Sequence, residues 1–351
     1  MKWNAIRVKL PKQIQSVELL RGIASSMVCY FHLARGNTNF LADDNFVKKM
    51  ATWGWSGVQI FFVISGFVIP YAMFQKKYTL RNFFTFLKKR IIRIEPPYLI
   101  SIVLIIVLAF VSTLSPLYRG APFHIDLPNL LGHIAYLNVF TGQKWLNDVY
   151  WSLAIEFQYY LLIAVSYGLI VSKKIYIRQG FLFLFLLSSF WLKDLGFVFV
   201  YATYFISGIL LFQLVSQLIS FTEYIISTVC VIGVLEFQQG TVLSLIVIGT
   251  ILVILFVNRV PAFFRFMGMI SYSLYLIHVP IGGRIINITE VKTGNMIIRE
   301  LMVPVAFAGC VLAAWIYYRL FEKRFKMYSS SIKYAGWATT SYEEKSTVPT
   351  T

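Results

Sequence analysis

The chain alternates long apolar runs that lack charged residues with short segments that carry Lys and Arg. A helix needs about 20 residues to cross a bilayer, and five runs approach or exceed this length. They span residues 50–75, 98–118, 195–222, 237–258 and 301–318. Two further runs, 266–283 and 149–172, contain one ionisable residue each. Three weaker candidates span residues 14–34, 179–192 and 224–235. The pattern predicts an all-α, polytopic integral membrane protein with about ten transmembrane helices.

Composition supports a membrane environment over a soluble one. Apolar residue types make up 58% of the chain and charged types 13%, so a soluble fold could not cover its surface with polar groups. The net charge of +17 does not indicate a nucleic-acid partner, because the basic residues lie between apolar runs instead of forming a soluble basic face. The three cysteines lie within apolar runs without metal-ligand or disulfide spacing, so we predict no metal site.

The distribution of basic residues predicts the topology. If the N-terminus is cytoplasmic, most Lys and Arg residues fall on the cytoplasmic side, and the helices must be even in number for the C-terminus to lie there too. We predict a transmembrane domain over residues 1–327 and a disordered cytoplasmic tail over 328–351, which is rich in Ser and Thr. The longest outer loop, 115–148, is expected to form a surface cap or an acceptor platform.

Ionisable residues within apolar runs need an explanation, because each costs roughly 2.5–3.5 kcal/mol on insertion scales. Arg21 and His32 are eleven residues apart, about three helical turns, so both point to nearly the same side of one helix. The alternative is a snorkelling arginine and an interfacial histidine. Ser271, Tyr275 and His278 form a polar stripe on another helix, again with His278 toward the outer surface.

A third helix adds Trp151, Ser152 and Glu156, of which Ser152 and Glu156 share a face. Polar groups in the outer halves of three helices predict a common cavity. For Glu156 the alternative is an ion pair that holds two helices together.

Arg90 and Arg93 lie three residues apart, shortly before Pro96 and Pro97, where we expect regular helix to be disrupted. Two guanidinium forks on one face suit phosphate oxygens, such as those of coenzyme A. The simpler interpretation, favoured by spacing alone, is a topology determinant that contacts anionic lipid. Ser65 and Gly66 lie mid-span, where small residues usually serve helix packing.

Five segments together resemble the membrane-bound acyltransferase family 3, the bacterial O-acyltransferases that modify lipopolysaccharide, exopolysaccharide and related surface glycans. They are 20–24 with His32, 57–67, 90–94 with 97–98, 151–156 and 271–278. The resemblance implies about ten transmembrane helices, an acyl-coenzyme A donor on the cytoplasmic side and an acceptor hydroxyl that is usually extracytoplasmic. The chain departs from the family at Gln59 and Phe157, where carboxylates are common.

The resemblance further implies a multi-pass protein of the bacterial inner membrane, similar to stand-alone exopolysaccharide and O-antigen acetylases. Its expected partners are acetyl-coenzyme A as co-substrate, a glycan or lipid-linked saccharide as acceptor, and membrane lipid, with no bound cofactor. It also implies that the Arg21–His32 pair and the arginines Arg90 and Arg93 matter for activity.

On this basis His32 is expected to act as general base on the acceptor hydroxyl, or as a transient acyl carrier. Arg21 would polarise the path or hold the donor, Arg90 and Arg93 would anchor its nucleotide, and Glu156 would orient His32 or His278. The remaining predicted residues would line the acceptor side: Trp151, Ser152, Ser271, Tyr275 and His278. The alternatives are a proton-coupled transporter or flippase of a polysaccharide precursor and, less well supported, a structural membrane subunit.

Overall fold

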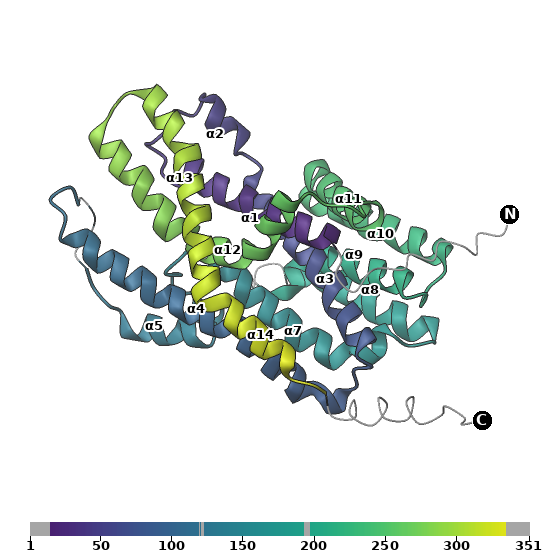
Figure 1. Cartoon of the computed structure of the whole chain (residues 1–351). Coiled ribbons are helices and arrows are strands. Elements are labelled where there is room, and N and C mark those ends of the chain that lie inside the picture. Colours follow the sequence, from purple (N-terminus) through teal and green to yellow (C-terminus); the bar gives the residue numbers. More distant parts are fainter. Residues whose placement is uncertain (1–14, 119, 121–122, 193–196, 335–351) are drawn as a thin grey trace, which may run out of the picture.

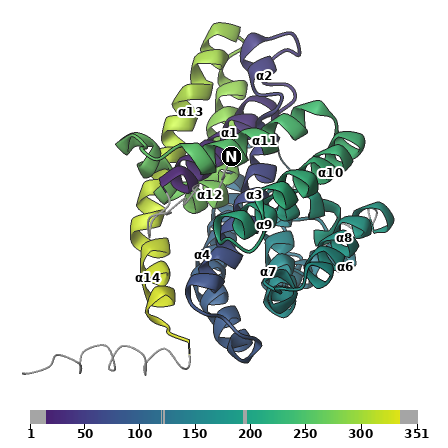
Figure 2. The same cartoon turned by 90° about the vertical axis from the view of Figure 1, so that its right-hand side faces the viewer.

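A computed structural model describes residues 15–118, 120, 123–192 and 197–334, and these contain helices but no strand. The long helices are α1 (Gln15–Arg35), α3 (Gly57–Gln75), α4 (Phe83–Thr113), α7 (Tyr150–Ile170), α8 (Ile175–Trp191), α9 (Ala202–Val215), α10 (Phe221–Gln239), α11 (Thr241–Phe256), α12 (Ala262–Lys292) and α13 (Met296–Tyr317). The short ones are α2 (Phe46–Met50), α5 (Leu127–Ile134), α6 (Asn138–Thr141) and α14 (Lys323–Ser331). In Figures 1 and 2, α8, α9 and α10 lie on one side and α13 and α14 on the other, with α1 and α3 between them.

Among the described residues, seven helical segments are long and apolar enough to cross a membrane: those that contain α3, α4, α7, α9, α10, α12 and α13, with α9 extended by the preceding 3₁₀ turn, Val198–Tyr201. Each of the ten predicted runs lies on a helix, but α8 and α11 are shorter than the seven segments, and α1 carries Glu18 and Arg21 near its start. The chain is therefore a multi-pass membrane protein, and its described residues confirm the prediction of an all-α fold. The count of ten spans and the cytoplasmic position of both termini stay predictions.

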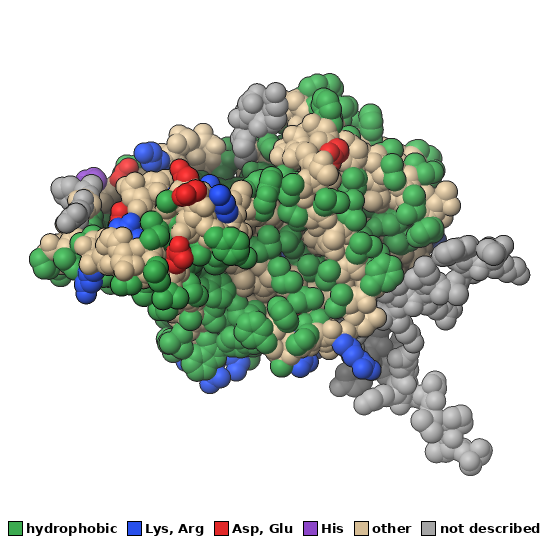
Figure 3. Space-filling model, turned by 90° about the horizontal axis from the view of Figure 1, so that it is seen from above, with side chains coloured by type: hydrophobic (Ala, Val, Ile, Leu, Met, Phe, Trp, Pro, Cys, Tyr) green, Lys and Arg blue, Asp and Glu red, His purple; other side chains and the backbone are tan. Residues whose placement is uncertain are grey.

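Large apolar side chains on the outside of the bundle match this environment. Phe84 and Phe237 are exposed, as are Val107 and Phe110 on α4 and Leu312 on α13. On the face in Figure 3, hydrophobic side chains cover the middle, most acidic side chains gather toward the left end, and basic side chains lie at that end and along the lower edge. Such an apolar surface is stable against lipid chains.

Two glycine contacts set the packing of the helices that carry the site. Gly22 on α1 meets Gly268 on α12, and a Cβ atom on Gly268 would clash with the backbone oxygen of Glu18. Gly66 on α3 meets Gly208 on α9 in the same way. Since glycine has no side chain, the backbones approach closely here, and the residues beside each contact are brought together.

The prediction that Pro96 and Pro97 disrupt the helix was wrong, because α4 continues through both residues. Pro96 and Pro97 leave the carbonyls of Ile92 and Arg93, four residues earlier, without their helical donors, and a proline within a membrane helix relies on support from neighbouring helices. The Tyr272 hydroxyl donates to the Ile94 carbonyl at 2.8 Å, and the Tyr317 hydroxyl donates to the Pro97 carbonyl at 2.5 Å. These contacts tie α4 to α12 and α13 at the proline pair.

The chain after α13 stays packed against α4. A π-helical segment, Tyr318–Glu322, leads into α14, and Lys89 Nζ donates to the carbonyls of Ser329 and Ile332. The Tyr334 ring contacts that of Tyr78, with centroids 6.0 Å apart. The ordered chain therefore continues past residue 328, where we predicted the tail to begin, and residues 335–351 of that tail lie outside the described residues.

His133 organises the loop between α4 and α7. Its Nδ1–H donates to the Asn129 carbonyl at 2.8 Å, and its Nε2 accepts from the Leu146 amide at 2.9 Å. Burial lowers the pKa of His133 below its ordinary 6.5, which favours this neutral form. The Asn147 side chain donates to the Leu276 carbonyl at 3.1 Å, which fastens the loop to α12.

Candidate active site

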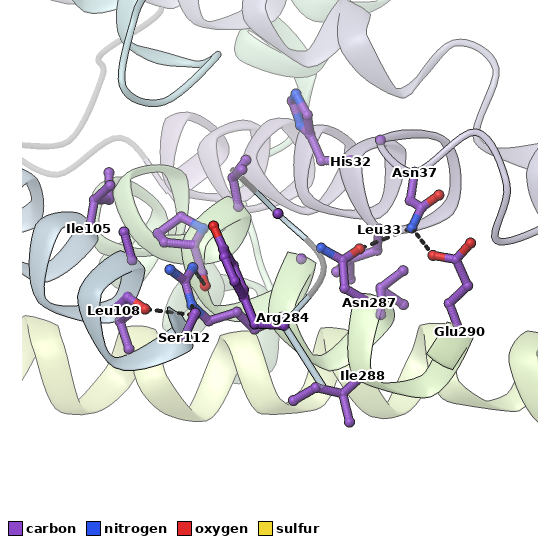
Figure 4. A pocket seen from close by; sticks show the side chains of 18 of the residues that line it. His32, Leu33, Asn37, Ile105, Leu108, Ser112, Arg284, Asn287, Ile288 and Glu290 are labelled. Carbon is purple, nitrogen blue, oxygen red and sulfur yellow. Dashed lines mark hydrogen bonds between the residues drawn. The ribbon is translucent and has the colours of Figure 1, made fainter. Parts of the chain in front are cut away.

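Apart from Trp151, the predicted site residues line two separate cavities instead of one. We call the larger one the histidine cavity; it has a volume of about 1080 Å³ and lies between α1, α4, α12 and residues 146–148. Its polar lining includes His32, Asn37, Ser112, Asp148, His278, Arg284, Asn287 and Glu290. Figure 4 shows His32 on one side of this cavity and Arg284, Asn287 and Glu290 across from it.

The smaller cavity, the arginine pocket, has a volume of about 120 Å³ and lies between α1, α3, α4, α7 and α12. Its polar lining consists of Arg21, Ser65, Arg90, Arg93, Ser152, Glu156, Tyr160, Ser271, Tyr272, Tyr275 and Glu322. The two cavities share no lining residue. The prediction of one cavity is corrected because a stripe of seven residues rises about 10 Å along a helix, so its two ends open into different spaces.

His32 and His278 meet across α1 and α12. His278 Nε2 lies 3.2 Å from His32 Nδ1, and the ring centroids are 5.1 Å apart. His278 is fully buried, and the close packing at Gly22 and Gly268 on the same two helices makes this contact possible. Residues 246 positions apart in the sequence thus form one pair.

Hydrogen bonds to carbonyl groups determine the tautomers of this pair. Nδ1 of His278 lies 2.9 Å from the Leu274 carbonyl, and Nδ1 of His32 lies 2.8 Å from the Val28 carbonyl. A carbonyl oxygen only accepts, so each neutral imidazole carries its proton on Nδ1. His278 Nε2 is then an acceptor for His32 Nδ1–H, and His32 Nε2 keeps a free lone pair. Asp148 lies near enough to interact electrostatically with His32.

Ser271 holds Arg21 in the arginine pocket. Ser271 Oγ donates to the Gly268 carbonyl at 2.9 Å and accepts from Arg21 Nε at 3.3 Å. The Arg90 guanidinium lies over the rings of Phe86 and Tyr160, 5.3 and 5.4 Å from their centroids. Stacking leaves the edge of a guanidinium available to an anion.

The Glu156 carboxylate accepts from Ser65 Oγ at 3.1 Å and from the Tyr160 hydroxyl at 2.6 Å. The prediction that Glu156 orients His32 or His278 is therefore corrected, since both imidazoles bond to carbonyls of their own helices. Glu156 also forms no ion pair: those between described residues are Lys48–Asp43 and Arg178–Glu223. Three arginines and two glutamates leave the pocket lining positive.

Four polar residues of the pocket were not predicted as site residues: Ser65, Tyr160, Tyr272 and Glu322. Ser65 was assigned to packing, although its position within a family segment was a signal for function. Glu322 was overlooked among the basic residues near the C-terminus; it is buried, and its Oε2 accepts from the backbone amide and hydroxyl of Ser273. It lies on the π-helical segment, a distortion that is frequent at functional sites.

Two of the predicted acceptor-side residues separate the cavities, and a third lies outside both. Ser152 Oγ and the Tyr275 hydroxyl are 2.5 Å apart, and the Tyr275 hydroxyl also lies 3.1 Å from the Val149 carbonyl. The Tyr275 ring contacts that of His278, with centroids 6.1 Å apart, so it stands between the pocket and the histidine pair. Trp151 lines neither cavity and stacks on Tyr201 at 5.5 Å.

Comparison with known proteins agrees with this arrangement. A family model described as an acyltransferase domain matches residues 14–319, most of the chain. The chain belongs to acyltransferase family 3. This membrane acyltransferase has all five motif segments within the matched region, and Glu322 and α14 lie beyond it. The family favours an enzyme over the transporter or flippase. Neither the comparison with curated proteins nor that with solved structures gives a match.

Proposed function

We propose that this acyltransferase moves an acetyl group from acetyl-coenzyme A to a hydroxyl of a cell-surface glycan in the bacterial inner membrane. The observation that carries the proposal is the tautomer arrangement of His32 and His278, which leaves a free lone pair on His32 Nε2. A sugar hydroxyl is a poor nucleophile until a base removes its proton, and a neutral imidazole is suited to this.

The proposed reaction balances without a bound cofactor. His32 Nε2 takes the proton of the acceptor hydroxyl while the hydroxyl oxygen attacks the thioester carbonyl. The carbon–sulfur bond then breaks, and the departing coenzyme A thiolate takes the proton back from His32. While the imidazole is positive, Asp148 stabilises it electrostatically. If an acyl-histidine forms instead, the same lone pair is the nucleophile.

The arginine pocket suits the donor. We assign Arg90 and Arg93 to the phosphates of coenzyme A, because the pocket lining carries more positive than negative charge and phosphates accept forked hydrogen bonds. The predicted topology places this end of α4 at the cytoplasmic surface, where acetyl-coenzyme A is available. Arg21, held by Ser271 deeper in the bundle, would contact the arm of the donor or its carbonyl.

The test is an acetyl-transfer assay with purified protein and labelled acetyl-coenzyme A. The acceptor is surface polysaccharide from cells in which the gene is disrupted, and NMR follows its ester content. His32→Ala should lower transfer by roughly 100-fold or more, the usual contribution of a general base. A folded His32→Ala protein that transfers acetyl at the wild-type rate would eliminate this mechanism.

A further inference from the structure

Arg284, which lines the histidine cavity, has guanidinium N–H groups that donate to no described residue. Arg284 Nε donates to Ser112 Oγ on α4 at 3.1 Å, and its Nη1 donates to the Pro280 carbonyl at 2.6 Å. Nη2 donates to no other described residue, and the side chain is half-buried in the cavity wall. Figure 4 shows the guanidinium beside Ser112, within the ring of lining residues. Arg284 is thus held in place with one edge open to a ligand.

Arg299, the other arginine of this cavity, differs in this respect. Its Nε donates to the Thr293 carbonyl, its Nη1 to the carbonyls of Asn39 and Phe40, and its Nη2 to the Glu290 carbonyl, at 2.9 to 3.3 Å. Each guanidinium nitrogen therefore has a backbone partner, and Arg299 stabilises the connection between α12 and α13. Of these two arginines, Arg284 keeps the larger donor capacity, because its Nη2 donates to no described residue whereas Nη2 of Arg299 has a carbonyl partner.

The wall next to Arg284 is apolar and reaches the outside of the bundle. On α4, Ile105, Leu108 and Val111 line the cavity. Val111 is also 52% exposed, and its neighbour Phe110 is 50% exposed on the outer surface. Since the outer surface of this helix faces lipid, a hydrocarbon chain could pass from the bilayer along α4 into the cavity.

The opposite end of the cavity is polar. The Asn37 side chain donates to Asn287 Oδ1 at 3.0 Å and to Glu290 Oε2 at 2.5 Å, which joins α1 to α12. Amide and carboxylate groups of this kind bind sugar hydroxyls, and His32 lies across the same cavity from Asn287 and Glu290. The cavity thus contains, in order, an apolar wall, a cation and a polar end.

We propose that the acceptor is a saccharide carried on a lipid phosphate, and that Arg284 binds this phosphate. The lipid chain lies along α4, the phosphate accepts from the Arg284 guanidinium, and the sugar reaches toward Asn37 and His32. This inference rests on the proposed function and narrows its acceptor from any surface glycan to a membrane-bound intermediate. Charge complementarity decides the assignment, because a phosphate accepts forked hydrogen bonds from a guanidinium.

Binding is tested first, without an acceptor sugar. The purified protein is kept in an uncharged polyoxyethylene detergent, and calorimetry measures the affinity for dodecyl phosphate, dodecanol and inorganic phosphate. We expect dodecyl phosphate to bind and the other two to bind at least tenfold more weakly. Arg284→Gln should weaken dodecyl phosphate binding roughly 10- to 100-fold, the range expected for a hydrogen bond to a charged group.

Two variants keep this test decisive. Arg265→Gln makes the same charge change at the exposed other end of α12 and should leave the affinity unchanged. Arg284→Lys keeps the positive charge but loses the fork, so it should bind with intermediate affinity. Equal binding of inorganic phosphate and dodecyl phosphate would overturn the lipid part of the inference. A folded Arg284→Gln protein with wild-type affinity would overturn the role of Arg284.

An acetyl-transfer assay with two forms of the acceptor distinguishes a failure of this inference from a failure of the proposed function. The acceptors are the lipid-linked saccharide fraction of cells in which the gene is disrupted and the same saccharides freed by mild acid. We expect the wild type to acetylate the lipid-linked form, and Arg284→Gln to raise KM for it at least tenfold without changing KM for acetyl-coenzyme A. Equal transfer to the freed saccharides refutes the inference alone. Absence of transfer to either form refutes the proposed function.

Discussion

The Ser152 and Tyr275 hydroxyls, on α7 and α12, meet at 2.5 Å between the arginine pocket and the histidine cavity. The Tyr275 ring contacts Phe61 on the pocket side and His278 on the cavity side, with centroids 5.8 and 6.1 Å apart. If the donor binds in the pocket and its thioester reacts at His32, its arm must pass this contact. Under the proposed function, the Ser152–Tyr275 contact would separate a donor bound in the pocket from water in the cavity until the arm of the donor passes it.

Tyr275→Ala should open the passage between the cavities. We expect hydrolysis of acetyl-coenzyme A in the absence of acceptor to rise several-fold, because water then reaches the thioester. Tyr275→Phe keeps the ring and should show a smaller rise. The measurement is release of coenzyme A thiol without acceptor. A Tyr275→Ala protein that binds acetyl-coenzyme A normally but hydrolyses it at the wild-type rate would contradict this role.

His278 should act on the reaction through His32. His278→Ala removes the second acceptor of His32 Nδ1–H, beside the Val28 carbonyl, so we expect kcat to fall roughly tenfold with little change in either KM. His278→Gln offers a side-chain oxygen as a substitute acceptor and should restore part of the rate. Steady-state kinetics with both substrates varied will check this. An equal loss in both variants would indicate that His278 serves only to pack α12.

Within the basic run of α4, Arg90 and Arg93 should contribute to donor binding, whereas Lys88 should not. Arg90→Gln combined with Arg93→Gln should raise KM for acetyl-coenzyme A at least tenfold, because forked contacts to phosphate are lost. Lys88→Gln, an exposed neighbour in the same run, is the control and should change KM less than twofold. If all three substitutions have the same small effect, these residues determine topology only.

Gly268→Ala should destabilise the contact between α1 and α12. The added Cβ would clash with the Glu18 backbone, and we expect a loss of roughly 1–3 kcal/mol in stability together with lower activity. Gly249→Ala on α11 is the control, since a Cβ there meets nothing within 4 Å and should be neutral or slightly stabilising. Thermal unfolding in detergent compares the two, and equal unfolding temperatures would contradict the close contact.

The loop between α4 and α7 should lose stability in acid through His133. Because burial lowers the pKa of His133 from 6.5, the folded protein holds the neutral form while the unfolded chain binds a proton more readily. The stability from this histidine is therefore present above pH 6.5 and is lost as the pH falls through the lowered folded-state pKa. Proteolysis of the loop between about pH 7.5 and about pH 5 measures this. His133→Gln should show a weaker pH dependence than the wild type.

The sequence alone determined the class of fold, because in lipid an apolar run of about 20 residues can satisfy its backbone hydrogen bonds only as a helix. It also identified Arg21, His32, Arg90, Arg93 and His278 as candidates, because the membrane makes ionisable side chains costly. The expected break at Pro96 did not occur, and the hydroxyls that tie α4 to its neighbours beside the prolines come from Tyr272 and Tyr317, far along the chain.

Only the tertiary structure decided which groups meet. The His32–His278 pair and the Arg21–Ser271 contact depend on the close approach of α1 and α12 at Gly22 and Gly268, which periodicity within one helix cannot reveal. The division into two cavities likewise depends on a contact between helices, the one at Tyr275. A helical pattern specifies which side chains share a face, whereas the partner of that face is set by packing between segments distant in sequence.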